Sequence, residues 1–119
     1  MREPTYYVLA CLVDGPLHGY ALIKRSEELS GGRVRLATGT LYATLDRLAA
    51  VGYVRLVSED IVDGRVRRSY GLTDPGATAL RAEAVRMADA ARIVTERKSA
   101  TASRQAQSDR ERGYKARMA

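Results

Sequence analysis

Apolar residues recur at helical spacing in three short segments near the start of the chain, and each segment ends at a turn signal. The segments cover residues 5–13, 18–29 and 38–51, and the residues that follow them include Asp14-Gly15-Pro16, Ser30-Gly31-Gly32 and Gly52. Thr38 is well suited to cap the third segment, on which one stripe contains Leu41, Leu45 and Leu48. The pattern therefore predicts three short helices with tight connections.

The period changes from 3.6 to 2 after Gly52. Residues 54–62 and 65–72 are rich in Val, Ile, Leu and Tyr, and they flank Asp63-Gly64, a favoured hairpin turn because both positions tolerate a positive φ. This turn predicts a register that pairs Val62 with Arg65, Ile61 with Val66, Asp60 with Arg67, Glu59 with Arg68, and Val57 with Tyr70. Opposed residues share a face, so the face predicted to cover a core consists of Val57, Ile61, Val66, Tyr70 and Leu72.

A fourth helix is predicted over residues 73–98, with Thr73 as its cap and Pro75 in its first turn. Roughly 23 of these residues are expected to be helical, and at about 1.5 Å per residue the helix is roughly 35 Å long, more than a head of this size can cover. A heptad-like seam along it favours pairing with a second copy of the chain, although packing on its own domain remains the alternative. The seam consists of Ala77, Leu80, Ala84, Met87, Ala91 and Val94.

The composition of the chain narrows the classes of protein to which it can belong. The chain has 119 residues and a formal net charge of +6, of which residues 1–72 contribute +2 and residues 99–119 contribute +3. A single cysteine and a single histidine exclude a disulfide framework and a multi-histidine metal centre, so we expect no enzyme, no metal and no cofactor. No apolar run approaches the ~20 residues that span a bilayer, and the N-terminus does not resemble a signal peptide; we expect a cytoplasmic protein without a membrane partner.

Three helices followed by a β-hairpin are the plan of a winged helix-turn-helix, a mainly α fold with a β-hairpin (α+β). The predicted organisation is a winged helix-turn-helix domain over residues 1–72 and a long C-terminal dimerisation helix over 73–98. Residues 99–119 form a basic, polar tail with almost no large apolar residue, for which a frayed helix or disorder is predicted.

Five short motifs carry a resemblance to a known family. In order and spacing the chain resembles the PadR family of bacterial transcriptional regulators over about residues 5–98. The motifs are His18-Gly19-Tyr20, Gly39-Thr40-Leu41-Tyr42, Leu45-Asp46-Arg47-Leu48, Gly52-Tyr53-Val54, and Tyr70-Gly71-Leu72-Thr73 with Gly76. The resemblance implies a homodimer that forms through the C-terminal helix, usually represses transcription and is often released by a small molecule. The single C-terminal helix is similar to that of the smaller size class of the family.

A two-fold dimer with one recognition helix per subunit is expected to bind double-stranded DNA at an inverted repeat. The third helix is predicted to present outward hydroxyl and small side chains with one arginine, and the hairpin to present three arginines. Asp60 and Glu59 oppose two of these arginines and lower the local positive field. The predicted DNA contacts are Arg33, Arg35, Thr38, Thr40, Tyr42, Thr44, Arg47, Arg65, Arg67 and Arg68. For Thr38 a cap, for Tyr42 packing, and for the arginines plain solvation are the alternatives.

The family resemblance also implies an effector cleft between subunits, lined by the first and fourth helices. The candidates are Tyr6, Tyr7, Ala10, Ala88, Ala91 and Arg92; the chain has no Trp or Phe to sandwich a planar ligand. His18 is expected to cap or pack, Cys11 to be a buried small hydrophobic residue, and Gly19 to let two helices approach closely. A winged-helix module that binds protein without DNA is the competing function.

Overall fold

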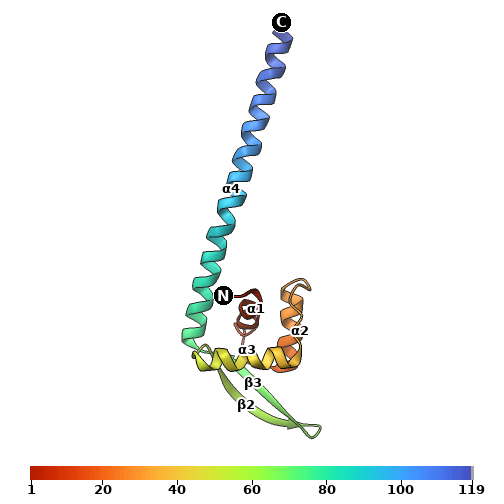
Figure 1. The fold of residues 1–119 in the computed structure, drawn as a ribbon, viewed down its shortest axis with the longest axis vertical. Helices are drawn as coiled ribbons and strands as arrows, with labels where there is room; N and C mark the ends of the chain where they lie inside the picture. The colour runs from red at the N-terminus through yellow and green to blue at the C-terminus, as the bar shows by residue number, and fades with distance from the viewer. Residues whose placement is uncertain (119) are drawn as a thin grey trace. The chain divides into compact units, whose positions relative to one another are not determined.

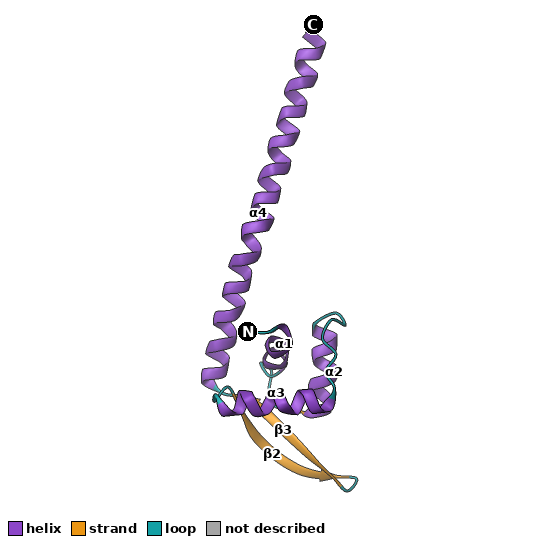
Figure 2. Ribbon diagram, in the orientation of Figure 1, coloured by secondary structure: helices purple, strands orange, loops and turns teal. Residues whose placement is uncertain are grey.

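The computed structural model describes the backbone of residues 1–118 and the side chains of residues 1–97, 104–110 and 112. Its elements run in the order α1 (Glu3–Cys11), β1 (Leu17–His18), α2 (Gly19–Leu29), α3 (Thr38–Ala50), β2 (Val54–Val62), β3 (Arg65–Leu72) and α4 (Asp74–Met118) (Figures 1 and 2). The chain divides into a head, residues 1–83, and a second unit, residues 84–119. The mainly helical winged helix-turn-helix fold is confirmed.

The three head helices form because their apolar stripes converge on one core. Val8 and Leu9 of α1, Leu22 of α2, and Leu41 and Leu45 of α3 are fully buried. Val54, Tyr70 and Leu80 close this core from the hairpin and from the start of α4. Helix α1 begins two residues earlier than predicted, because Pro4 is tolerated in a first helical turn.

A two-residue strand, β1, was not predicted. Leu17 pairs with Tyr70 and His18 with Ser69, which makes a three-stranded antiparallel sheet in the order β1-β3-β2. The predicted helix over 18–29 therefore starts at Gly19. His18 is its cap, since its Nδ1 accepts a hydrogen bond from the Ala21 N–H (3.3 Å).

The hairpin turn is as predicted, with Asp63 at φ 50° and Gly64 at φ 73°. The register is correct from Val62–Arg65 to Glu59–Arg68, but Leu56, not Val57, is opposite Tyr70. A β-bulge lies between Leu56 and Ser58 and shifts the pairing by one residue.

The hairpin covers less of the core than the sequence predicts. Tyr70 is buried and Leu72 half-buried, whereas Val57, Ile61 and Val66 are 41%, 78% and 57% exposed, so the prediction that these three residues cover a core is wrong. Only the base of the hairpin packs on the core formed by the helices, and the far end of the hairpin extends away from that core (Figure 2).

Helix α4 has 45 residues, longer than the 23 or so expected, and it continues through the predicted tail to Met118; residue 119 lies outside the described residues. Its start is capped as predicted, because the Thr73 hydroxyl accepts a hydrogen bond from the Gly76 N–H (3.1 Å). No strong helix breaker other than Gly113 follows Gly76, and alanine, arginine and glutamine favour the helix. Within the described part of the chain, no helix is long and apolar enough to cross a membrane.

Candidate nucleic-acid interface

The outward face of α3 is small, polar and free of acid in its first turn. Thr38, Gly39, Thr40, Ala43 and Arg47 are all exposed on it. Short side chains allow the backbone of a helix to approach a DNA groove closely, and a threonine can bond a base or a phosphate. Ala37, not Thr38, occupies the cap position; it makes no side-chain cap bond, and Thr38 is the first helical residue. The Thr38 hydroxyl is therefore not committed to the cap that the sequence suggested.

Thr44 does not face outward, and that part of the prediction is wrong. It is only 3% exposed, because it lies on the same stripe as Leu41, Leu45 and Leu48. Its hydroxyl can be buried since it donates a hydrogen bond to the Thr40 carbonyl oxygen (2.9 Å). The same hydroxyl accepts a hydrogen bond from the Arg47 guanidinium (3.3 Å). Thr44 thus holds an exposed arginine on the outer face rather than reaching a partner itself.

Tyr42 is half-buried on the flank of α3, where its phenol packs against the first residue of α2. A Cβ added to Gly19 would lie 2.6 Å from the Tyr42 hydroxyl oxygen, closer than real Cβ contacts come. The expectation that Gly19 permits a close approach is confirmed, and the element that approaches is α3.

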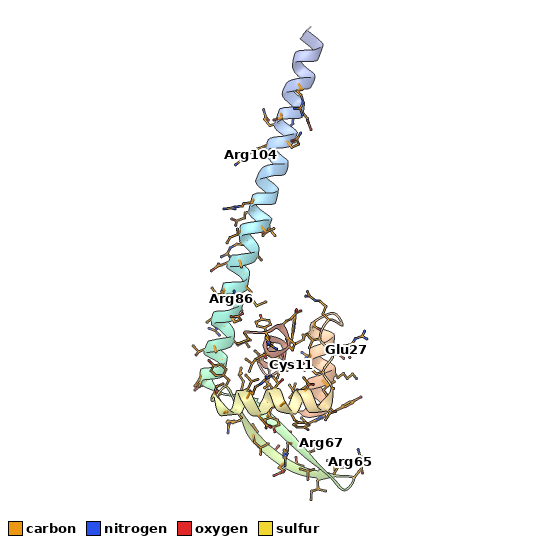
Figure 3. All side chains as sticks on the ribbon, in the orientation of Figure 1. Cys11, Glu27, Arg65, Arg67, Arg86 and Arg104 are labelled. Carbon is orange, nitrogen blue, oxygen red and sulfur yellow. The ribbon has the colours of Figure 1, made fainter. Side chains whose placement is uncertain are left out.

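The three arginines of β3 differ in how far an acidic residue offsets their charge. Arg68 donates a hydrogen bond to the Glu59 carboxylate (3.1 Å), which raises the pKa of Arg68. Arg67 is opposite Asp60, while Arg65 is opposite Val62. Figure 3 shows Arg65 and Arg67 towards the far end of the hairpin. Arg65 is therefore the hairpin arginine least offset by an opposed acid.

Arg33 and Arg35, just before α3, are exposed but paired. Arg33 bonds Glu3 of α1 (3.0 Å), and Arg35 lies 3.5 Å from Glu27 of α2. Exposed pairs of this kind are worth about 0–1 kcal/mol, so an anion of higher charge density can compete for either arginine.

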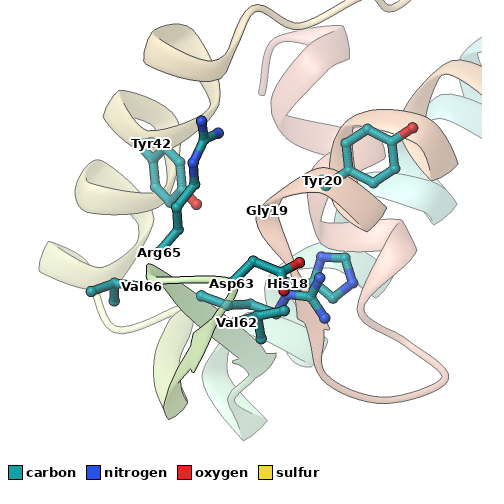
Figure 4. A pocket seen from close by; sticks show the side chains of 9 residues that line it. His18, Gly19, Tyr20, Tyr42, Val62, Asp63, Arg65 and Val66 are labelled. Atoms are coloured by element: carbon teal, nitrogen blue, oxygen red, sulfur yellow. The ribbon is translucent and has the colours of Figure 1, made fainter.

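A cleft of about 550 Å³ lies between the hairpin and the start of α2, and we call it the wing cleft (Figure 4). Tyr42, Arg65 and Arg67 line it, together with residues that were not among the predicted contacts, including His18 and Tyr20. His18-Gly19-Tyr20 is one of the motifs of the sequence, but its residue types do not indicate that the hairpin lies opposite.

The residues predicted to bind an effector fall in both units. Tyr6, Tyr7 and Ala10 lie half-buried on α1 in the head, with the two tyrosine rings edge to face at 5.6 Å between centroids. Ala88, Ala91 and Arg92 are exposed on the second unit, where Arg92 pairs with Asp89. The effector site remains a prediction.

The seam residues also differ in their surroundings. Leu80 is 7% exposed and belongs to the core of its own head. Ala77, Met87, Ala91 and Val94 are exposed and Ala84 is half-buried. Leu80 therefore has a folding role within one chain, while dimerisation through the remaining residues stays a prediction.

Cys11 is buried as expected, and it hydrogen-bonds the Ser26 hydroxyl (3.5 Å). Burial raises the pKa of the Cys11 thiol, so the neutral form is favoured. Among the residues that the structure describes, no group of three or more His, Cys, Asp and Glu side chains could hold a metal ion.

Comparison with known proteins assigns the head to a protein family. The family model "Transcriptional regulator PadR-like family" matches residues 8–82. Transcriptional regulator Rv3488 of Mycobacterium tuberculosis is 41% identical over 97 residues, which are 81% of this chain and 86% of that protein. An uncharacterized 37.1 kDa protein in transposon TN4556 of Streptomyces fradiae is 42% identical over 87 residues, 73% of this chain and 24% of that protein. This chain thus spans about a quarter of the Streptomyces protein.

The fold also matches solved structures. The crystal structure of Bacillus subtilis PadR in complex with operator DNA superimposes with a TM-score of 0.63 and 24% identity. The match covers 71% of this chain and 49% of that chain. At this identity the likeness establishes a common fold.

Proposed function

Because the chain belongs to the PadR-like family of transcriptional regulators, we propose that it binds operator DNA as a homodimer in the cytoplasm. In this proposal it represses transcription until a small molecule releases it. The family consists of regulators rather than enzymes.

The observation that carries the proposal is the outer face of α3. Its first turn holds no acid, its side chains are short, and Arg47 is held on the same face by Thr44. Arg65 and Arg67 on the hairpin add positive charge beside it. This combination suits α3 to a DNA groove and the hairpin to the adjacent sugar–phosphate backbone.

The proposed homodimer is supported by the second unit. Its helix exposes Met87, Ala91 and Val94, with Ala84 half-buried beside them, and a seam of this kind on two copies of the chain gives a two-fold dimer. Two recognition helices related by a two-fold axis favour an inverted repeat whose half-sites are about one helical turn apart. The effector is proposed to bind between two subunits, as the family implies, with Tyr6, Tyr7 and Ala10 of α1 and Ala88, Ala91 and Arg92 of α4 as the candidates.

The test begins with a duplex selected from a random library by the wild-type protein, followed by anisotropy binding at three salt concentrations on that duplex and a scrambled one. Six to eight neutralised phosphates per dimer give a log–log salt slope of about −5 to −7. Thr40→Ala and Arg47→Ala should lose more affinity on the selected duplex. Arg65→Ala should lose affinity equally on both duplexes and flatten the slope.

Arg25→Ala is the matched control, because it removes the same charge from an exposed position on α2, paired with Asp14 and outside the wing cleft. It should leave the slope nearly unchanged. Binding that does not depend on salt would reject the DNA proposal and favour the protein-binding module. Equal losses for all three interface variants on both duplexes would reject sequence reading by α3.

A further inference from the structure

The wing cleft concentrates hydrogen-bond donors and positive charge. Arg65 and Arg67 line it from the hairpin, Tyr42 from α3, and His18 from the cap of α2, while Asp63 is the acid among its lining residues. Figure 4 shows Arg65, Tyr42 and His18 around the cleft. Its volume of about 550 Å³ lies in the range of ligand sites. A site with several donors and two guanidinium groups favours an oxyanion such as a phosphate.

His18 has one ring nitrogen available for such a partner. Because Nδ1 accepts the Ala21 N–H, the neutral imidazole carries its proton on Nε2, which makes Nε2 a donor. Among the residues that the structure describes, the imidazole makes no other hydrogen bond. The cap on α2 therefore fixes both the tautomer and the position of a second, unused donor in a residue that lines the cleft.

The Tyr42 hydroxyl is fixed in the cleft by a different constraint. It lies directly against Gly19, in space that any side chain at position 19 would occupy. The imidazole that caps α2 and the phenol of α3 thus line the same cleft as the arginines of the hairpin, and Val62 and Val66 add an apolar part to the wall.

We propose that the wing cleft seats one phosphate of the DNA backbone with its deoxyribose, and that His18 donates to this phosphate through Nε2 while it caps α2 through Nδ1. The proposal rests on the proposed function, and it adds a contact residue and its chemistry. A phosphate beside the groove that α3 enters is within reach of the hairpin arginines, and the sugar meets the valines.

The decisive variant is His18→Asn. Asparagine is a good helix cap, so it keeps the bond to the Ala21 N–H, but it lacks a donor at the Nε2 position. At pH 8 we expect the melting midpoint to stay the same and the affinity to fall at least about tenfold, as expected for a lost hydrogen bond to a charged group. The loss should be equal on the selected and the scrambled duplex, since a phosphate carries no base sequence.

The salt slope separates this contact from those of the arginines. A neutral imidazole displaces no counterion, so His18→Asn should leave the slope unchanged, whereas Arg65→Ala should flatten it. Wild-type affinity in His18→Asn, with Arg65→Ala still defective, would overturn the assignment of His18 and leave the proposed function intact. If the wild-type protein bound neither duplex, both would fall.

The single histidine provides a second readout that does not depend on any variant. In untagged protein its ring proton resonances belong to His18 alone, and we expect the duplex to shift them. At constant ionic strength, 10 mM inorganic phosphate should shift them much less. A shift with inorganic phosphate but none with the duplex would make the cleft a site for a free anion and would overturn the proposal.

Discussion

The junction between β3 and α4 provides a sharp test of the packing, through Gly76→Ala. Gly76 is buried in the first turn of α4. An added Cβ would lie 2.8 Å from the Tyr53 carbonyl carbon and 2.9 Å from Leu72 Cδ1, against about 3.5–4.0 Å for an ordinary carbon contact. The obstacle is backbone, so it cannot be relieved by a rotamer change alone.

Relief requires the Tyr53 peptide or the start of α4 to move. The Tyr53 carbonyl accepts the Thr73 N–H (3.1 Å), so its movement also endangers a hydrogen bond worth about 1 kcal/mol. Overpacking destabilises a protein by about 1–3 kcal/mol, whereas the higher helix propensity of alanine stabilises the helix by about 0.5–1 kcal/mol relative to glycine. We expect Gly76→Ala to lower the free energy of unfolding by about 2 kcal/mol, or the melting midpoint by about 8–16 °C.

Gly39→Ala is the matched control. It makes the same change in the first turn of α3, but an added Cβ there meets nothing within 4 Å. It should be neutral or slightly stabilising in urea unfolding followed by circular dichroism. Equal midpoints for the two variants, with equal m-values, would refute the close packing of α4 on Tyr53.

Three further predictions address other parts of the chain. Leu80→Ala should cost the head about 2–5 kcal/mol of stability in urea unfolding, whereas Met87→Asp should leave the head stable but yield monomers in sedimentation; a dimer in the second case would reject the seam. Glu3→Gln frees Arg33 and should steepen the salt slope of DNA binding with a stability change below about 1 kcal/mol; an unchanged slope would show that Arg33 does not reach phosphate. Cys11 should react with iodoacetamide only as fast as the protein opens, and fast labelling of the native protein would contradict its burial. Because burial raises the pKa of the folded thiol above that of the unfolded one, the free energy of unfolding should decline as pH rises above about 8.5, and the thiol should not change it at lower pH.

Periodicity in the sequence located all the helices and the hairpin because each has an amphipathic face several residues long. It could not locate β1, since two residues define no period and Leu17 and His18 are extended only because β3 pairs with them. The bulge could not be predicted from periodicity either. Val57 Cγ2 occupies the space beside Gly71 where a Cβ would be, so the shift depends on a missing side chain in the opposite strand.

The candidate site was predictable in its charges but not in its geometry. Residue type identified the arginines, but the leucine stripe of α3 is wider than its spacing predicts. Thr44 lies on the stripe, and the Thr40 carbonyl oxygen satisfies its hydroxyl inside the helix. The wing cleft joins residues that are more than forty positions apart. Only the return of the hairpin past α2, set by the pairing of His18 with Ser69, brings them together.

The stripe on α4 shows why spacing alone cannot name the surface that a helix buries. A helix packed on its own domain and a helix paired with a second copy both require apolar residues every three or four positions. In this chain the stripe packs on its own domain at Leu80, which is buried in the head. Beyond Glu83 the larger residues of the stripe are exposed, and Met87 is 40% exposed. Dimerisation therefore has to be tested beyond Glu83, because a substitution at Leu80 disturbs the head whether or not the chain pairs.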